Sequence, residues 1–158
     1  MNEETKELRV IGRAENISLP EQGIDKIPAR IDTGAKTSAI WASGMQVKDG
    51  VLSFVFFDKQ SQFYNGVRHN VTEFSEQVVA SSNGMVEKRF RVQLLVKIRG
   101  KKIRAAFTLA NRSTQVYPVL IGRNVLTGKF VVDVKKGKPQ REAERLREAQ
   151  LQSQLNDL

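Results

Sequence analysis

Apolar and polar residues alternate along much of the chain with a period of two, which is the pattern of half-buried β-strands. The alternation is clearest in residues 90–98 and 103–109, where every second residue is apolar. An apolar run at 51–57, interrupted only by Ser53 and carrying three phenylalanines, has the length of a buried strand. Shorter strands are predicted at 8–13, 27–31, 117–121 and 130–134, so we expect a mainly β domain.

Residues 71–98 are expected to form a long hairpin. Its turn contains Asn83-Gly84, a pair that suits the positive φ angles of a tight hairpin turn. The second arm and the turn after it are rich in Lys and Arg. Arg89 and its basic neighbours could select acidic side chains of a bound partner, or they could simply form a solvated face.

The composition changes at Lys135. Residues 1–134 are expected to form one domain, and 135–158 a charged linker followed by a segment that can form a helix. Leu146, Leu151 and Leu155 give that segment only a thin apolar stripe. We expect a frayed or partner-dependent helix outside the core.

The formal charge is +9, from 26 Lys and Arg residues against 17 Asp and Glu residues. Such a balance favours an acidic partner: nucleic acid, an anionic surface or an acidic peptide. Nucleic acid is the least favoured of these, because no aromatic residues are interleaved with the basic ones to stack bases. The polar N-terminus and the lack of a long apolar run predict a cytoplasmic protein that does not enter membranes.

The densest group of chemically useful side chains lies at 29–38. Ile31 favours an extended backbone, and Gly34 permits a sharp turn, so Asp32 is expected at the tip of a strand-to-loop turn. Hydroxyl groups at Thr33, Thr37 and Ser38 can orient the carboxylate. We predict that Asp32 is the catalytic residue.

Two short motifs carry a family resemblance. Asp32-Thr33-Gly34-Ala35 resembles the active-site signature of the retropepsin-like aspartic proteases, and Gly122-Arg123-Asn124, after an apolar strand, resembles their second signature. The closer similarity is to a bacterial group labelled ATP-dependent zinc proteases and found in the company of glutamate ligases. It rests on residues 31–35, 82–84, 120–123 and 132–133.

The label of that group fits the residues poorly. His69 is the only histidine, there is no cysteine, and neither a His-Glu-x-x-His pair nor a phosphate-binding Gly-x-x-x-x-Gly-Lys-[Ser/Thr] loop is present. We therefore predict no metal and no cofactor. His69 falls in an insertion at about 45–70, relative to the retropepsins, and is expected to be solvated in a polar loop. Trp41 is expected to pack in the core.

The resemblance implies a small closed barrel of the acid-protease type with one short C-terminal helix. It also implies a homodimer, because the chain has a single Asp-Thr-Gly and the mechanism needs two carboxylates. The implied site has Asp32 as the catalytic residue, supported by Thr33, Gly34, Ala35, Gly122 and Arg123, with a flap that binds substrate through Ser82, Asn83, Gly84, Met85 and Arg89. Lys36 stands where retroviral members usually carry an acid that pairs with the arginine, so Arg123 must find another partner.

Together these features predict a homodimeric aspartic endopeptidase. Two Asp32 carboxylates would activate a water molecule, and the substrates would be acidic, Glu-rich peptides. The alternative is a non-catalytic domain of the same fold that binds an acidic peptide or RNA without cutting it.

Overall fold

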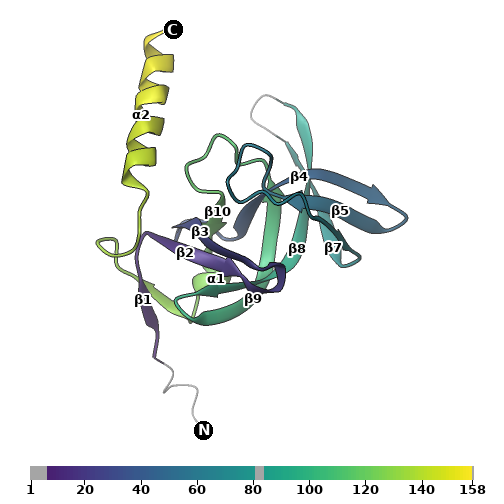
Figure 1. Cartoon of the computed structure of the whole chain (residues 1–158), viewed down its shortest axis with the longest axis horizontal. Coiled ribbons are helices and arrows are strands. Elements are labelled where there is room, and N and C mark those ends of the chain that lie inside the picture. Colours follow the sequence, from purple (N-terminus) through teal and green to yellow (C-terminus); the bar gives the residue numbers. More distant parts are fainter. Residues whose placement is uncertain (1–6, 81–83, 158) are drawn as a thin grey trace.

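The computed structural model describes residues 7–80 and 84–157. Its elements, in chain order, are β1 (Arg9–Ile11), β2 (Ala14–Leu19), a 3₁₀ turn (Pro20–Gln22), β3 (Ile24–Ile31), β4 (Ser38–Lys48), β5 (Val51–Phe56), β6 (Arg68–Val71), β7 (Phe74–Ala80), β8 (Val86–Ile98), β9 (Lys101–Ala110), β10 (Val119–Ile121), α1 (Arg123–Leu126), β11 (Phe130–Val132) and α2 (Arg141–Asn156). The chain is mainly β, as the alternation predicts (Figure 1).

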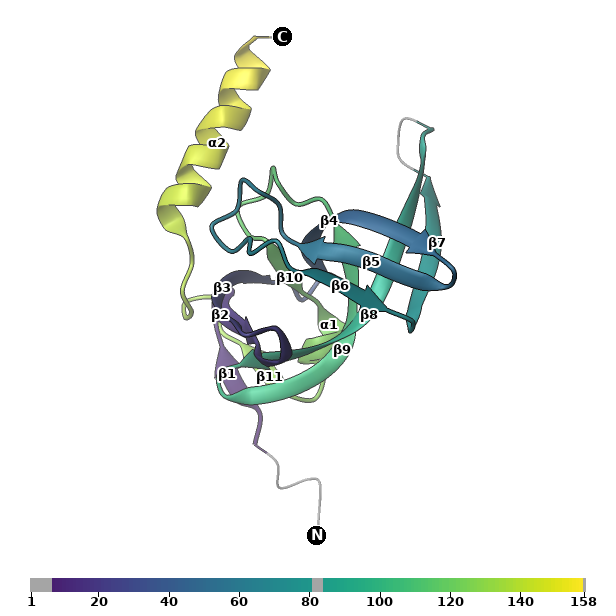
Figure 2. The ribbon, with the colours of Figure 1, turned by 45° about the vertical axis from the view of Figure 1, so that its right-hand side comes forward.

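Six strands close into a barrel in the order β10, β3, β2, β8, β9 and β4, with β4 returning to β10. The closing strand β10 is short, and it pairs parallel with β3 on one side and antiparallel with β4 on the other. The ring is visible in Figure 2. The predicted closed barrel and the short helix α1 are therefore confirmed.

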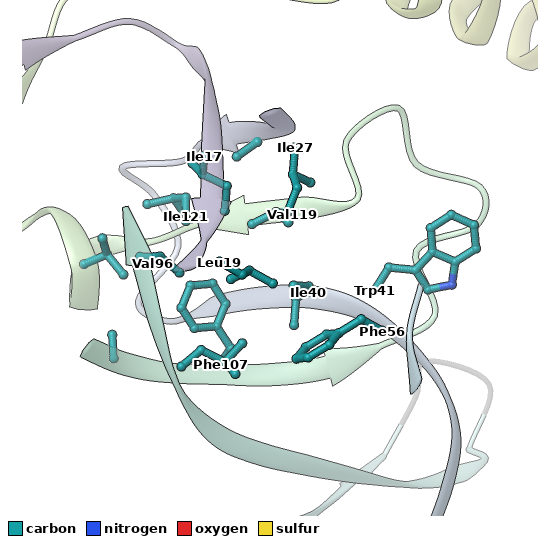
Figure 3. Close-up of a cluster of buried hydrophobic side chains, with 14 of the residues drawn as sticks. Ile17, Leu19, Ile27, Ile40, Trp41, Phe56, Val96, Phe107, Val119 and Ile121 are labelled. Atoms are coloured by element: carbon teal, nitrogen blue, oxygen red, sulfur yellow. The ribbon is translucent and has the colours of Figure 1, made fainter. Parts of the chain in front are cut away.

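The barrel is filled by the apolar side chains that the alternation marked. Figure 3 shows residues from β2, β3, β4, β8, β9 and β10 meeting inside it, with Phe107 and Ile40 near the middle. Both of these residues are fully buried. The alternate apolar positions of 90–98 and 103–109 all face the core, and Trp41 is also buried there, as expected.

The insertion at about 45–70 contains the buried strand predicted at 51–57, which is β5, and its polar part adds a further strand, β6. Both strands extend the sheet beside the barrel from the end of β4. His69 lies on β6 opposite Phe54, and its ring is 5.7 Å from that of Phe54 and 4.8 Å from that of Phe56. The prediction of a solvated loop histidine is wrong, because His69 packs half-buried on two aromatic rings. This burial lowers its pKa.

Three features lie outside the closed ring of strands. Strands β1 and β11 form a separate two-stranded parallel sheet, and β7 pairs with the first part of the barrel strand β8 to form the predicted long hairpin. Helix α2 extends away from the barrel in both views (Figures 1 and 2) and has no buried residue. Within residues 7–80 and 84–157, no helix combines the length and apolarity that crossing a bilayer would need.

Candidate active site

Asp32 lies directly after β3, at the tip of the predicted strand-to-loop turn. Its backbone N–H donates to the carbonyl of Ile121 at 2.8 Å, which continues the β3–β10 pairing to the end of the strand. The half-buried side chain accepts a hydrogen bond at Oδ1 from the N–H of Gly34 at 2.9 Å. The turn closes when the N–H of Ala35 donates to the Asp32 carbonyl at 3.2 Å. These bonds fix the direction of the carboxylate.

The second motif, residues 122–124, is hydrogen-bonded to this turn. The N–H of Arg123 donates to the carbonyl of Ala35 at 2.8 Å, and that of Asn124 donates to Lys36 at 3.2 Å. Gly122 passes so close that a Cβ there would lie 2.2 Å from the carbonyl oxygen of Thr37. Only glycine fits at this crossing, which explains why the second motif begins with one.

Ser38 adds a side-chain link between the two motifs. Its fully buried hydroxyl accepts the N–H of Gly122 at 2.9 Å and donates to Asn124 Oδ1 at 2.7 Å. The amide group of Asn124 then donates to the carbonyl of Ala106 on β9 at 2.9 Å. The sequence analysis gave Asn124 no role; its place directly after Gly122-Arg123 was the available signal.

Arg123 does find another partner, as the presence of Lys36 requires. Its Nη1 donates to the backbone carbonyl of Thr33 at 3.1 Å. This contact holds the exposed Thr33 against α1. The group that accepts from Arg123 is a backbone carbonyl, whereas the retroviral pattern implies an acidic side chain. The residues that lie together around this turn are Asp32, Thr33, Gly34, Ala35, Gly122 and Arg123.

The hairpin of β7 and β8 pairs from Phe74–Val92 to Ala80–Val86. Gly84, at its turn, has the positive φ of 81° that the sequence analysis expected, and Met85 is exposed. Ser82 and Asn83 lie outside the described residues. Arg89 faces Glu87 at 3.6 Å, so a glutamate of the same strand lies within its reach. Its proposed contact with substrate stays a prediction.

A cluster of basic residues that the sequence analysis missed lies beside β3. Arg13, Arg30 and Arg112 line one side of a cavity of about 620 Å³, which also touches Ile31, the residue before Asp32. We call this cavity the arginine cleft. Burial, followed by the nearby charge of Arg30, lowers the pKa of Arg112. Pairing of β2 with β3 brings Arg13 and Arg30 together, because Ala14, the residue after Arg13, lies opposite Arg30.

Candidate metal ligands are not clustered. Among residues 7–80 and 84–157, no group of three or more His, Asp or Glu side chains is placed to hold a metal ion.

A carboxylate in a hydrogen-bonded turn, at the end of a strand of a closed six-stranded barrel, places the chain among the retropepsin-like proteins. A family model described as retropepsin-like aspartic endopeptidase RimB matches residues 10–143. The chain belongs to this RimB-like family.

The curated relatives carry a different name. A probable alpha-L-glutamate ligase of Desulfotalea psychrophila is 32% identical over 129 residues, which are 79% of this chain and 28% of that protein. A probable alpha-L-glutamate ligase of Shewanella halifaxensis is 30% identical over 128 residues, again 28% of its length. The chain thus spans little more than a quarter of these relatives.

A solved structure shares the fold. A Legionella pneumophila protein of unknown function (DUF785) superposes with a TM-score of 0.59 at 24% identity, over 82% of this chain and 95% of that one. This similarity supports the architecture alone.

Proposed function

We propose that the chain is an aspartic endopeptidase that works as a homodimer and cuts acidic, Glu-rich peptides. The observation that carries the proposal is the Asp32 carboxylate, which accepts the N–H of Gly34 at 2.9 Å in a turn bonded to residues 121–124. Family membership supports the same reaction. A carboxylate held in this way is suited to work beside a second one.

The chemistry requires two Asp32 residues, one from each subunit. Two carboxylates a few ångströms apart share one proton, because both cannot stay ionised. The ionised group takes a proton from a water molecule held between them, and the water oxygen attacks the scissile carbonyl. The protonated group donates a hydrogen bond to that carbonyl oxygen and stabilises its developing charge. The C–N bond of the tetrahedral intermediate then breaks as the leaving nitrogen takes the proton that the dyad received from water. Because the nucleophile is water, no covalent enzyme intermediate forms.

The small sheet of β1 and β11 supports a second copy as the partner. Val10 lies opposite Val131 in this sheet, and both are nearly half exposed. Leu8 and Val134, just beyond the two strands, are also exposed. Apolar side chains grouped on a short exposed sheet are typical of an interface, and a single-carboxylate subunit needs one.

Three observations support an acidic substrate. The formal charge is +9, and the arginine cleft adjoins the residue before Asp32. The names of the relatives from Desulfotalea psychrophila and Shewanella halifaxensis refer to glutamate ligation. Peptides that contain consecutive glutamates are therefore the first substrates to test.

The test is cleavage of a Glu-rich peptide followed by mass spectrometry. We expect the wild-type chain to cut it and Asp32→Asn to be inactive with its fold intact, because the Asn amide cannot accept the water proton. Asp25→Asn removes an exposed carboxylate from the same strand and serves as the matched control. Equal turnover by wild type and Asp32→Asn would overturn the mechanism.

Mixing tests the dimer directly. Wild type and Asp32→Asn are combined in equal amounts and allowed to exchange subunits, so about a quarter of the dimers retain two carboxylates. We expect activity per total protein to fall to about that fraction. Activity of one half would mean that each subunit works alone. Val131→Glu should separate the subunits in sedimentation velocity and abolish cleavage together.

A further inference from the structure

The charges around the arginine cleft divide sharply between the barrel and α2. The barrel and its loops supply Arg13, Arg30 and Arg112 and no acidic residue, whereas α2 supplies Glu144 and Glu148 together with Arg147. The barrel side of the cleft is thus a cationic wall, and the carboxylates that face it come from the C-terminal helix.

Glu144 is bound in this cleft as a ligand carboxylate would be. Arg13 donates to it through Nη1 at 2.8 Å and Nη2 at 2.9 Å, the bidentate geometry in which Arg recognises a carboxylate. The hydroxyl of Tyr117 donates a third bond at 2.7 Å, and it accepts the N–H of Gln140 in turn. The bonds from Arg13, then that from Tyr117, lower the pKa of Glu144 to about 2.

The rest of α2 has no comparable hold on the barrel. None of its residues is buried, and Leu146, Leu151 and Leu155 stay about half exposed or more. Arg30 lines the cleft, yet in the described part of the chain its side chain makes no hydrogen bond or ion pair. A helix anchor would not need this free guanidinium, whereas a site for several carboxylates would.

We propose that the arginine cleft binds glutamate side chains of the substrate, and that α2 occupies it in cis through Glu144. Substrate and helix then compete for Arg13, and a longer acidic peptide gains Arg30 and Arg112 in addition. Ile31, which lines the cleft, is the last residue of β3, so a peptide bound there contacts the strand one residue before Asp32; Asp32 itself does not line the cleft. This inference rests on the proposed function for its substrate, but its test measures binding alone.

The experiment uses the full-length chain with Asp32→Asn, so that bound peptide is not consumed. Fluorescence anisotropy measures the affinity for a labelled hexaglutamate peptide at fixed ionic strength, with a hexaglutamine peptide as the uncharged control. Glu144→Gln is compared with Glu142→Gln, which removes the same charge from the same helix but pairs with Arg145 outside the cleft. We expect Glu144→Gln to bind about tenfold more tightly than its parent, and Glu142→Gln to change affinity by less than about twofold.

A second pair of variants tests the wall of the cleft. In the Glu144→Gln background, Arg30→Gln should weaken binding about tenfold. Arg104→Gln, which removes an exposed arginine paired with Glu21, should change it by less than about twofold. Equal affinities for the two glutamate variants, or for the two arginine variants, would overturn the proposal.

The two proposals can fail separately. If Glu144→Gln binds hexaglutamate more tightly but the chain with Asp32 intact does not cleave the peptide, the proposal of a cis-bound helix stands and that of a protease fails. If the chain with Asp32 intact cleaves the peptide but Glu144→Gln leaves the affinity for hexaglutamate unchanged, the protease proposal stands and that of a cis-bound helix fails.

Discussion

The Asp32 turn and helix α2 are held to the barrel in opposite ways. The turn is fixed by backbone hydrogen bonds with residues 121–124 and by a glycine crossing with no room for a methyl group. Helix α2 is fixed mainly by one carboxylate that receives bonds from Arg13 and Tyr117. Close packing gives the Asp32 turn a single geometry. The polar anchor of α2 is a single carboxylate, and another carboxylate can take its place.

This difference separates chemistry from access. A catalytic carboxylate must keep its direction through many turnovers, and a loop cross-linked by backbone hydrogen bonds provides that. A helix that competes with substrate must leave without disturbing the barrel, and a helix with no buried residue can do so. Three predictions, from the largest effect to the smallest, test whether the two regions differ in this way.

Gly122→Ala should have the largest effect. The new Cβ would lie 2.2 Å from the carbonyl oxygen of Thr37 and 2.8 Å from that of Ala35, and both are backbone atoms that cannot move aside. We expect the free energy of unfolding, measured with urea, to fall by about 3 kcal/mol or more. Gly128→Ala meets no atom within 4 Å and strains only its φ of 75°, so it should cost about 1 kcal/mol. Similar losses in both variants would contradict the tight crossing.

Ser38→Ala comes next. It leaves the buried N–H of Gly122 without its acceptor and removes the bond to Asn124. We expect a loss of about 2 kcal/mol in the same urea measurement. Ser53→Ala removes a hydroxyl that accepts a bond from exposed Arg68, and it should cost less than about 0.5 kcal/mol. If the two serine variants unfolded alike, the hydroxyl link could not be what braces the turn.

Acid should release α2 with the smallest effect on the barrel. The pKa of Glu144 is lowered from 4.5 to about 2 by Arg13 first and then Tyr117, with Arg141 adding its charge. Its contribution is therefore complete above pH 4.5 and is lost as the pH falls through about 2. The chemical shift of the Gln140 amide, which donates to Tyr117, reports the release.

Glu144→Gln is the control for this titration. Without the carboxylate, the Gln140 amide should show the released shift at neutral pH and no step on acidification. Because α2 buries no residue, the same variant should lower the free energy of unfolding of the whole chain by less than about 1 kcal/mol. A step of unchanged size in Glu144→Gln would assign the titration to another group.

The barrel could be predicted well because the alternation within each strand shows which of its faces is buried. In 90–98 and 103–109, every second residue is apolar, and this alternation alone indicates which side chains face inward, whichever strand lies beside them. The Asp32 turn was equally accessible, since Ile31 and Gly34 define it locally. Its contact with the Gly122-Arg123 motif followed only from the family resemblance.

The arginine cleft escaped prediction because it depends on long-range pairing. Arg13 and Arg30 become neighbours through the β2–β3 register, and Arg112 approaches from the loop before β10. None of these positions is unusual along the chain. His69 was misjudged for the same reason: its sequence neighbours are polar, but the β5–β6 pairing sets it on Phe54 and Phe56.

The linker that carries α2 is itself fastened to the barrel. Gly137 fits against the carbonyl of Ala14 where a Cβ would lie 2.3 Å away, and the N–H of Lys138 donates to that same carbonyl at 2.7 Å. A released helix therefore stays tethered beside the cleft, at an effective concentration on the order of millimolar. A lone free glutamate below that concentration cannot displace Glu144. A run of linked glutamates can displace Glu144, because each further carboxylate that reaches Arg30 or Arg112 adds to its avidity. The tether thereby sets a minimum length for the peptides that the cleft accepts.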